Sequence, residues 1–253
     1  MPGPTTGRAL KTTQTSLRIL ELVLEHEGLT LAELDGLVDK PKSSLHSHLE
    51  TLRGCRYLKR NGHTYEVSFR LALLGEQVRR RTRLDTVATD IVTDLSKRTG
   101  EEANFTVLEH GRLLMLCGSA PTAAHDDDGF RREYYLHNTA AGKAILAEMD
   151  REQVEAVLDR WGMPRETEAT IADRDRLFDA LDETKRRGYG IVDEEFAPGL
   201  LAVGATVHDE DGTLLGGLSV GGPKYRIDTA QLYGDLADAV LEAVDTLEQT
   251  LLQ

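Results

Sequence analysis

The N-terminal part of the chain carries apolar residues at helical spacing in consecutive stretches. The first predicted helix begins between Thr12 and Ser16, where hydroxyl groups can cap it, and it stops at Gly28. Its apolar positions recur every three or four residues, at Leu17, Ile19, Leu20, Val23 and Leu24. Thr30 followed three residues later by Glu33 is a capping-box pattern, which predicts a short second helix through residues 34–38.

A third predicted helix begins at Pro41 and has one polar face. Its apolar stripe consists of Leu45, Leu49 and Leu52, spaced i, i+4 and i+7. The other face carries short hydrogen-bonding side chains and one cation near the helix N-terminus: Lys42, Ser43, Ser44, His46 and Ser47. Such side chains are small enough to approach base edges in the major groove, and a helix N-terminus attracts phosphate. We therefore predict that this helix reads DNA.

Two strand-like stretches follow, at residues 57–60 and 63–67. Asn61-Gly62 between them is the strongest short signal for a hairpin. The hairpin carries three basic or titratable side chains suited to a DNA contact: Lys59, Arg60 and His63. Two helices, a polar-faced helix and a hairpin together predict a winged helix-turn-helix for residues 1–67. A winged helix that binds only protein remains the alternative.

The charge distribution favours the nucleic-acid interpretation. Residues 1–84 carry 14 Lys and Arg against 9 Asp and Glu, whereas the rest of the chain carries 16 against 34. A basic module on an acidic chain usually has an anionic partner. Arginine outnumbers lysine by 22 to 8, and the carboxylates are in surplus. This composition resembles proteins of a salt-rich cytoplasm, as in halophilic archaea, with a high-GC genome as the alternative explanation.

A linker helix is predicted for residues 68–84, with an apolar face at Leu71, Leu74 and Val78. Arginines gather at its end, at positions 79, 80, 81 and 83. Cations near a helix C-terminus are favoured by the helix dipole, and this interpretation is preferred over a contact with DNA or a partner subunit. The chain is thus divided into a DNA-binding domain, the linker, and a second domain at residues 85–253.

In the second domain, strand and helix patterns mix without strict alternation. Strands are predicted at residues 104–108, 112–117, 200–208 and 213–220, and helices at 87–100, 140–147, 151–161, 174–187 and 229–251. Thr139 is the expected cap of the helix that starts at Ala140, whose small first turn leaves main-chain N–H groups accessible to an anion. Elements mixed in this way predict an α+β domain in which helices flank an antiparallel sheet.

Motifs for cofactors, metals and membranes are missing from the sequence. It has no phosphate-binding loop, HExxH or paired-cysteine motif, so we expect no cofactor and no metal. His125 before three aspartates is a weak metal signal, and a solvated loop at residues 120–132 is preferred. Two isolated cysteines, no long apolar run and no apolar leader predict a cytoplasmic protein without a membrane partner. An enzyme remains an alternative, because five ionisable residues are available: His137, Lys143, Asp193, Glu194 and Glu195.

Several short stretches, in this order and spacing, resemble the IclR (isocitrate lyase regulator) family of transcription regulators over nearly the whole chain. They are Lys42-Ser43-Ser44-Leu45-His46, residues 137–147, Arg187-Gly188-Tyr189-Gly190, Glu194-Glu195, Gly199 and residues 218–223. The resemblance implies a winged helix and a C-terminal GAF-like domain that binds a small-molecule effector, without enzymatic activity. It also implies homodimers or homotetramers on palindromic operators of double-stranded DNA, controlling carbon or aromatic-acid catabolism.

The resemblance implies an effector site formed by Thr139, Ala140, Ala141, Val192, Ala202, Ser219 and Gly221. The family usually has Asp at the place of Val192, often Cys at that of Ala202, and a second Ser at that of Gly221. Fewer polar anchors disfavour a short glyoxylate-like acid and favour a larger, less polar organic acid. Ser47 stands where the family commonly has Arg, which predicts a different operator. A C-terminal domain that only dimerises remains the alternative.

Overall fold

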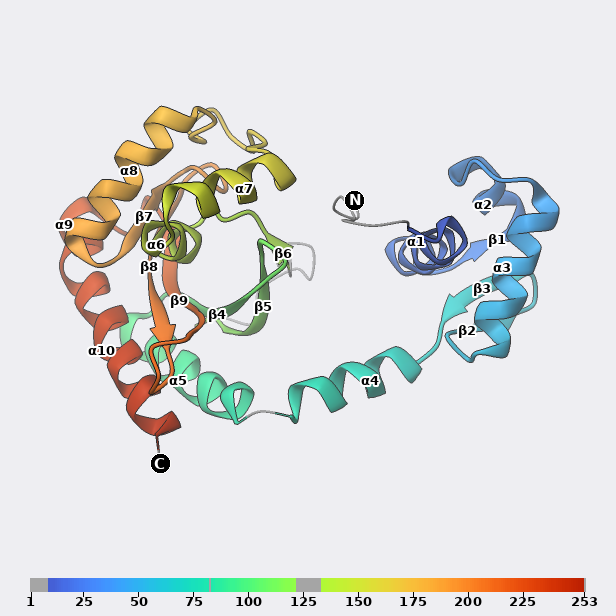
Figure 1. Cartoon of the computed structure of the whole chain (residues 1–253). Coiled ribbons are helices and arrows are strands. Elements are labelled where there is room, and N and C mark those ends of the chain that lie inside the picture. The colour runs from blue at the N-terminus through green and yellow to red at the C-terminus, as the bar shows by residue number, and fades with distance from the viewer. Residues whose placement is uncertain (1–8, 82, 122–132, 253) are drawn as a thin grey trace. The chain divides into compact units, whose positions relative to one another are not determined.

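The computed structural model describes residues 9–81, 83–121 and 133–252 (Figure 1). The chain separates into two units, Met1–Thr82 and Arg83–Gln253. Each unit encloses its own hydrophobic core, so each is described by itself. Most of the predicted acidic loop, including His125 and the aspartates after it, lies outside the described residues.

The described part of the first unit combines helices with a small antiparallel sheet in the order β1-β3-β2. Its elements are α1 (Lys11–Glu25), β1 (Leu29–Thr30), α2 (Leu31–Leu37), α3 (Lys42–Gly54), β2 (Leu58–Asn61), β3 (Thr64–Val67) and α4 (Arg70–Arg79). The core joins the apolar stripes of α1, α2 and α3, with Ile19, Leu34 and Leu45 fully buried. The predicted capping box is present, since Glu33 N–H donates to Thr30 Oγ1 and Thr30 N–H donates to Glu33 Oε2.

Three local predictions for this unit are wrong. Helix α1 begins at Lys11 without a side-chain cap, and it ends at Glu25 rather than at Gly28. The hairpin turn is Gly62-His63, because Asn61 pairs with Thr64 and so belongs to the strand. The short strand β1 was not predicted, since two residues are too few to show an alternating pattern.

Helix α4, the predicted linker helix, has no buried residue. On this helix Leu73 and Val78 are 66% and 61% exposed and Phe69 just before it is 84% exposed, whereas Leu71 and Leu74 are half-buried.

The second unit is built on a six-stranded antiparallel sheet in the order β6-β5-β4-β9-β8-β7 (Figure 1). Its strands are β4 (Glu102–Glu109), β5 (Arg112–Ser119), β6 (Glu133–Tyr134), β7 (Gly190–Asp193), β8 (Leu200–His208) and β9 (Leu214–Pro223). Its helices are α5 (Leu84–Thr99), α6 (Ala140–Glu148), α7 (Arg151–Trp161), α8 (Arg174–Arg187), α9 (Thr229–Tyr233) and α10 (Asp235–Leu251). The α+β architecture is confirmed.

The sheet separates two layers of helices. On β8, Leu201, Val203, Ala205 and Val207 join the core that also contains the apolar side chains of α5 and α10. Because side chains alternate along a strand, Ala202 and Gly204 face the opposite layer, where α6 packs together with α7 and α8.

Helix α6 lies unusually close to the sheet. A Cβ atom on Gly190 would stand 2.1 Å from the carbonyl oxygen of Ala140, and one on Gly204 would stand 2.6 Å from the amide nitrogen of Ala141. The two strands therefore need glycine at these points to accept the helix backbone. This close packing fixes the position of the α6 N-terminus over β7 and β8.

Other predictions for this unit also need correction. The last predicted helix is broken at Gly234, whose φ and ψ of −109° and −98° are not helical, into α9 and α10. Strands β6 and β7 were not predicted. Thr139 precedes α6 as expected, but its hydroxyl donates to the carbonyl oxygen of Tyr135 at 3.0 Å and does not cap the helix.

Candidate functional sites: the DNA-binding face and a ligand cavity

The polar face predicted on α3 is accessible in the first unit. Lys42, Ser43, His46 and Ser47 are exposed and Ser44 is half-buried, all within the first two turns of the helix. The opposite stripe of Leu45, Leu49 and Leu52 is buried in the core, so the core orients the polar face outward. The Ser47 hydroxyl donates to the carbonyl oxygen of Ser43 and keeps lone pairs free for a base or phosphate donor.

The predicted cations differ in how they are held. Lys42 Nζ lies 3.3 Å from Asp35 and Lys59 Nζ lies 2.8 Å from Glu66, so both charges are partly balanced within the protein. Arg60 instead donates to the carbonyl oxygen of Gly62 at 2.9 Å and lies 5.6 Å from the centre of the Tyr65 ring. The exposed His63 occupies the turn itself. Arg60 and His63 therefore carry the wing's accessible hydrogen-bond donors.

In the second unit, the seven predicted effector residues line a single cavity of about 250 Å³. Thr139, Ala140 and Ala141 come from the start of α6, and the others come from β7, β8 and β9: Val192, Ala202, Ser219 and Gly221. The alternation of the strands brings these residues to the α6 side of the sheet. Their role in effector binding remains a prediction.

Sequence reasoning missed the far wall of this cavity. Strand β4 contributes Glu102, Asn104 and Thr106, which alternate with the apolar residues of the opposite face. That alternation of polar and apolar positions was a usable signal. Tyr134 and Phe196 form an aromatic part of the wall, with ring centres 5.5 Å apart and planes at 68°. Nothing in the local sequence links these two distant aromatic residues.

The cavity offers a few polar groups within mostly apolar walls. The first turn of α6 has no capping side chain, so its N–H groups and the positive end of the helix dipole are available to an anion. Ser219 Oγ donates to Asn104 Oδ1 at 2.9 Å, and the amide nitrogen of Asn104 is a hydrogen-bond donor. Val192 and Ala202 are apolar. A ligand with one acidic group and an apolar body matches this pattern.

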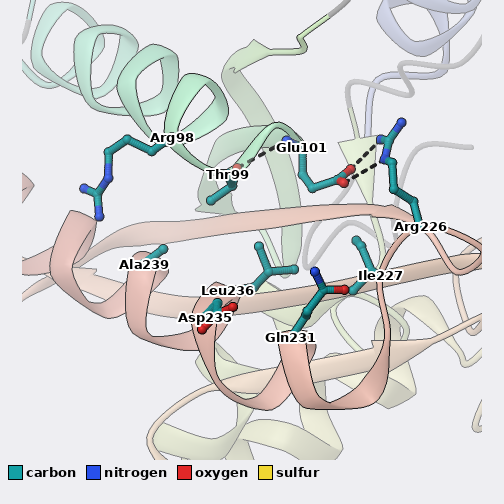
Figure 2. A pocket seen from close by; sticks show the side chains of 9 residues that line it. All are labelled: Arg98, Thr99, Glu101, Arg226, Ile227, Gln231, Asp235, Leu236 and Ala239. Atoms are coloured by element: carbon teal, nitrogen blue, oxygen red, sulfur yellow. Dashed lines mark hydrogen bonds and ion pairs between the residues drawn. The ribbon is translucent and has the colours of Figure 1, made fainter.

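A second cavity, of about 340 Å³, lies on the other face of the sheet, between the end of α5 and the α9–α10 segment. Figure 2 shows Arg226 beside Glu101 and, across the hollow, Arg98. Arg226 Nε donates to Glu101 Oε1 at 2.7 Å, and Arg98 Nη2 donates to Glu242 at 2.7 Å. Because carboxylates already engage both guanidinium groups, this hollow is a weaker candidate for an acidic ligand.

The ionisable residues considered for catalysis do not form one cluster. Asp193 and Glu194 lie toward the surface, where Lys224 Nζ binds them at 2.7 and 2.6 Å. The Lys224 hydrogen bond lowers the pKa of Glu194, and Gly199 N–H adds to the effect. Lys143 and Glu195 form a separate buried ion pair. The carboxylate of Glu195 therefore neither binds loop backbone nor lies at the surface.

His137 is buried, and its Nε2 lies 3.2 Å from the carbonyl oxygen of Pro164. Burial lowers the pKa of His137, which favours the neutral ring. Among the described residues, no group of three or more His, Cys, Asp or Glu side chains is arranged to hold a metal. The same part of the chain contains no helix with the length and apolar character needed to cross a membrane.

The fold and these sites define a class: a helix-turn-helix protein joined to a ligand-sensing domain. The model of the IclR helix-turn-helix domain matches residues 13–62, and that of the bacterial transcriptional regulator IclR C-terminal domain matches residues 76–249. The chain belongs to the IclR family of transcriptional regulators, with an N-terminal DNA-binding domain and a C-terminal effector-binding domain.

Individual relatives cover nearly the whole chain. The chain is 31% identical to the HTH-type transcriptional regulator BhcR of Paracoccus denitrificans, over 92% of its length and 84% of that protein. It is 26% identical to the probable HTH-type transcriptional regulator ArcR of Halobacterium salinarum, over 96% of this chain and 95% of that protein. The same fold occurs in the crystal structure of an IclR homolog from Microbacterium hydrocarbonoxydans complexed with 4-hydroxybenzoate. The TM-score is 0.78 and the sequence identity is 21%, over 95% of this chain and 99% of that chain.

Proposed function

We propose that α3 and the wing bind double-stranded operator DNA through the eight residues predicted from the sequence. The observation that carries this proposal is the exposed polar face of α3, held outward by a fully buried leucine stripe. In this arrangement α3 enters the major groove and reads base edges, while the wing contacts phosphates.

Two substitutions test the division of roles. If Arg60 contacts a phosphate, Arg60→Ala weakens binding to all sequences about equally and lowers the salt slope by about one unit. Ser44→Ala instead changes the preference at particular bases, by about 1–3 kcal/mol where a good base contact is lost. Arg18→Ala is the control, since Arg18 is an exposed cation of α1 paired with Glu21 and Glu25. Unchanged binding of both test variants would remove this face from DNA recognition.

We also propose that the protein is a homodimer through its N-terminal unit. Leu17 and Leu24 are 54% and 64% exposed, and their spacing of seven residues puts them on one face of α1, while Leu10, directly before the helix, is 69% exposed. An exposed apolar stripe of this kind is suited to pack against its own copy, and a twofold dimer reads a palindromic operator. Leu17→Glu then yields monomers in sedimentation velocity, whereas Thr12→Glu, about 140° around the helix, leaves the dimer intact.

We infer further that the cavity binds an organic acid with one carboxylate and a planar apolar body. The α6 N-terminus receives the carboxylate, while Val192, Ala202 and the Tyr134–Phe196 pair contact the body. The presence of this cavity also favours a sensing role for the C-terminal domain over the alternative that the domain only dimerises.

Effector binding and its effect on DNA must both be measured. Isothermal titration against 4-hydroxybenzoate, benzoate and glyoxylate is expected to rank the two aromatic acids above glyoxylate. A bound acid changes operator affinity only as far as it discriminates between two conformations of the protein, so the titration is repeated on the DNA complex. Stronger binding of glyoxylate would refute the proposed ligand class. We propose that the regulated genes serve the catabolism of such acids, in the cytoplasm where the chromosomal operator lies.

A further inference from the structure

A buried ion pair lies behind the effector cavity without lining it. Lys143, on α6, is 2% exposed, and its partner Glu195 is 7% exposed. Every neighbour of Lys143 on α6 from Ala140 to Ala147 is buried as well. Taking two charges out of water is costly, and a pair of apolar side chains of similar size often gives equal or better stability. Stability alone therefore does not explain a charged pair at this position.

The pair connects three segments that each supply part of the cavity wall. Lys143 follows Ala140 and Ala141 on α6, whose side chains line the cavity. Its Nζ donates to the carbonyl oxygen of Ile191 at 3.2 Å, next to the lining residue Val192 on β7. It also donates to the carboxylate of Glu195, which directly precedes the lining residues Phe196 and Ala197. One ammonium group thus links the helix, the strand and the loop.

The loop that holds Glu195 is fixed on its other side by main-chain contacts. Thr170 Oγ1 donates to the carbonyl oxygen of Glu195 at 2.7 Å, and Thr167 Oγ1 donates to that of Glu194 at 2.7 Å. The carboxylate itself depends on Lys143, because its Oε2 atom is buried with no hydrogen-bond partner among the described residues. Burial lowers the pKa of Lys143, and the nearby Glu195 carboxylate opposes that shift, so it favours the charged ammonium group.

We propose that Lys143 and Glu195 are positioning residues for effector recognition: the pair sets the distance between the α6 N-terminus and the Phe196–Ala197 wall. The inference rests on the proposed effector function of the cavity and adds the element that shapes it. Neither side chain touches the ligand. Their effect on affinity passes through the α6 N–H groups and the aromatic wall.

A double substitution separates positioning from stability. Lys143→Met and Glu195→Leu alone each leave one buried charge unpaired and lower the thermal midpoint. The double variant Lys143→Met/Glu195→Leu removes both charges and recovers most of that midpoint. If the pair positions the wall, the recovered variant still binds 4-hydroxybenzoate at least tenfold more weakly than wild type and loses the effector response on DNA. Wild-type affinity in the recovered double variant would overturn the proposal.

Two further variants keep the test decisive. Glu195→Asp retains the charge but shortens the side chain by one methylene, so this variant is expected to fold and to bind the acid more weakly. If the double variant does not fold, unchanged affinity in Glu195→Asp overturns the proposal. Lys224→Met is the matched control, because it removes an exposed lysine bound to Asp193 and Glu194 beside the same loop. It is expected to bind the acid as wild type does.

If the proposed effector function is wrong, the wild-type protein binds none of the three acids. This result is distinct from a failure of the positioning role. The pair is then judged by amide hydrogen exchange, which needs no ligand. Faster exchange at residues 191–200 in Glu195→Asp, with α10 unchanged, supports the positioning role. Unchanged exchange in that segment overturns it.

Discussion

Gly190→Ala tests how closely α6 is held against the sheet. Gly190 does not have a positive φ, so alanine meets no backbone strain there and the effect is purely steric. The added Cβ would lie 2.1 Å from the carbonyl oxygen of Ala140 and 3.0 Å from the amide nitrogen of Ala144. A carbon and a carbonyl oxygen need roughly 3.3 Å, so helix and strand must separate by about 1 Å.

Separation of this size has two measurable consequences. Overpacking in a well-packed core costs about 1–3 kcal/mol, which urea denaturation detects as a lower midpoint with an unchanged slope. The α6 N-terminus also moves away from the sheet that forms the rest of the cavity wall. If about 1.4 kcal/mol of its interaction with the ligand carboxylate is lost, effector affinity falls by about tenfold. Operator affinity without effector is expected to stay near the wild-type value, since the DNA-binding unit has its own core.

Gly36→Ala is the matched control for this substitution. Gly36 lies within α2, and a Cβ there would meet no atom within 4 Å. Alanine at such a helical site stabilises by about 0.4–1 kcal/mol, since it restricts the unfolded chain. If Gly190→Ala matches wild type in both midpoint and effector affinity, α6 and β7 are not in the close contact that the glycine permits.

Three other outcomes are expected. Ala202→Leu extends the side chain at position 202 over Gly221, which is paired with it on the neighbouring strand and has no side chain. The leucine fills the cavity and abolishes effector binding in calorimetry, whereas Ala202→Ser preserves effector binding. Burial lowers the pKa of His137, so near and below the ordinary pKa of 6.5 the unfolded chain binds more protons than the folded chain. The free energy of unfolding therefore falls as the pH drops from 7.5 to 5.5. His137→Gln flattens this pH dependence in urea titrations. If the carboxylate surplus is an adaptation to salt, specific operator binding persists near about 1 M salt and the protein aggregates or unfolds on dialysis into dilute buffer; full stability there would contradict the adaptation.

Much of the fold could be predicted from local patterns. The helices α7 and α8 begin and end where expected, because their period, their capping residues and the glycine after each are contiguous in sequence. Strand β7 was missed because four residues that begin with a glycine show no alternation, and its assignment depends on pairing with β8. The break at Gly234 was missed because apolar residues continue at helical spacing on both sides.

The sequence by itself determined which residue types are available and which face of each helix is apolar. The tertiary structure decided the rest of the cavity: that Asn104 lies opposite α6, that Tyr134 meets Phe196, and that Lys143 reaches Glu195. Hydrogen bonds join Lys143 to Glu195, 52 positions apart, and Ser219 to Asn104, 115 positions apart. The physical reason is that helix periodicity and capping act within a few residues, whereas strand register and helix docking depend on packing between distant segments.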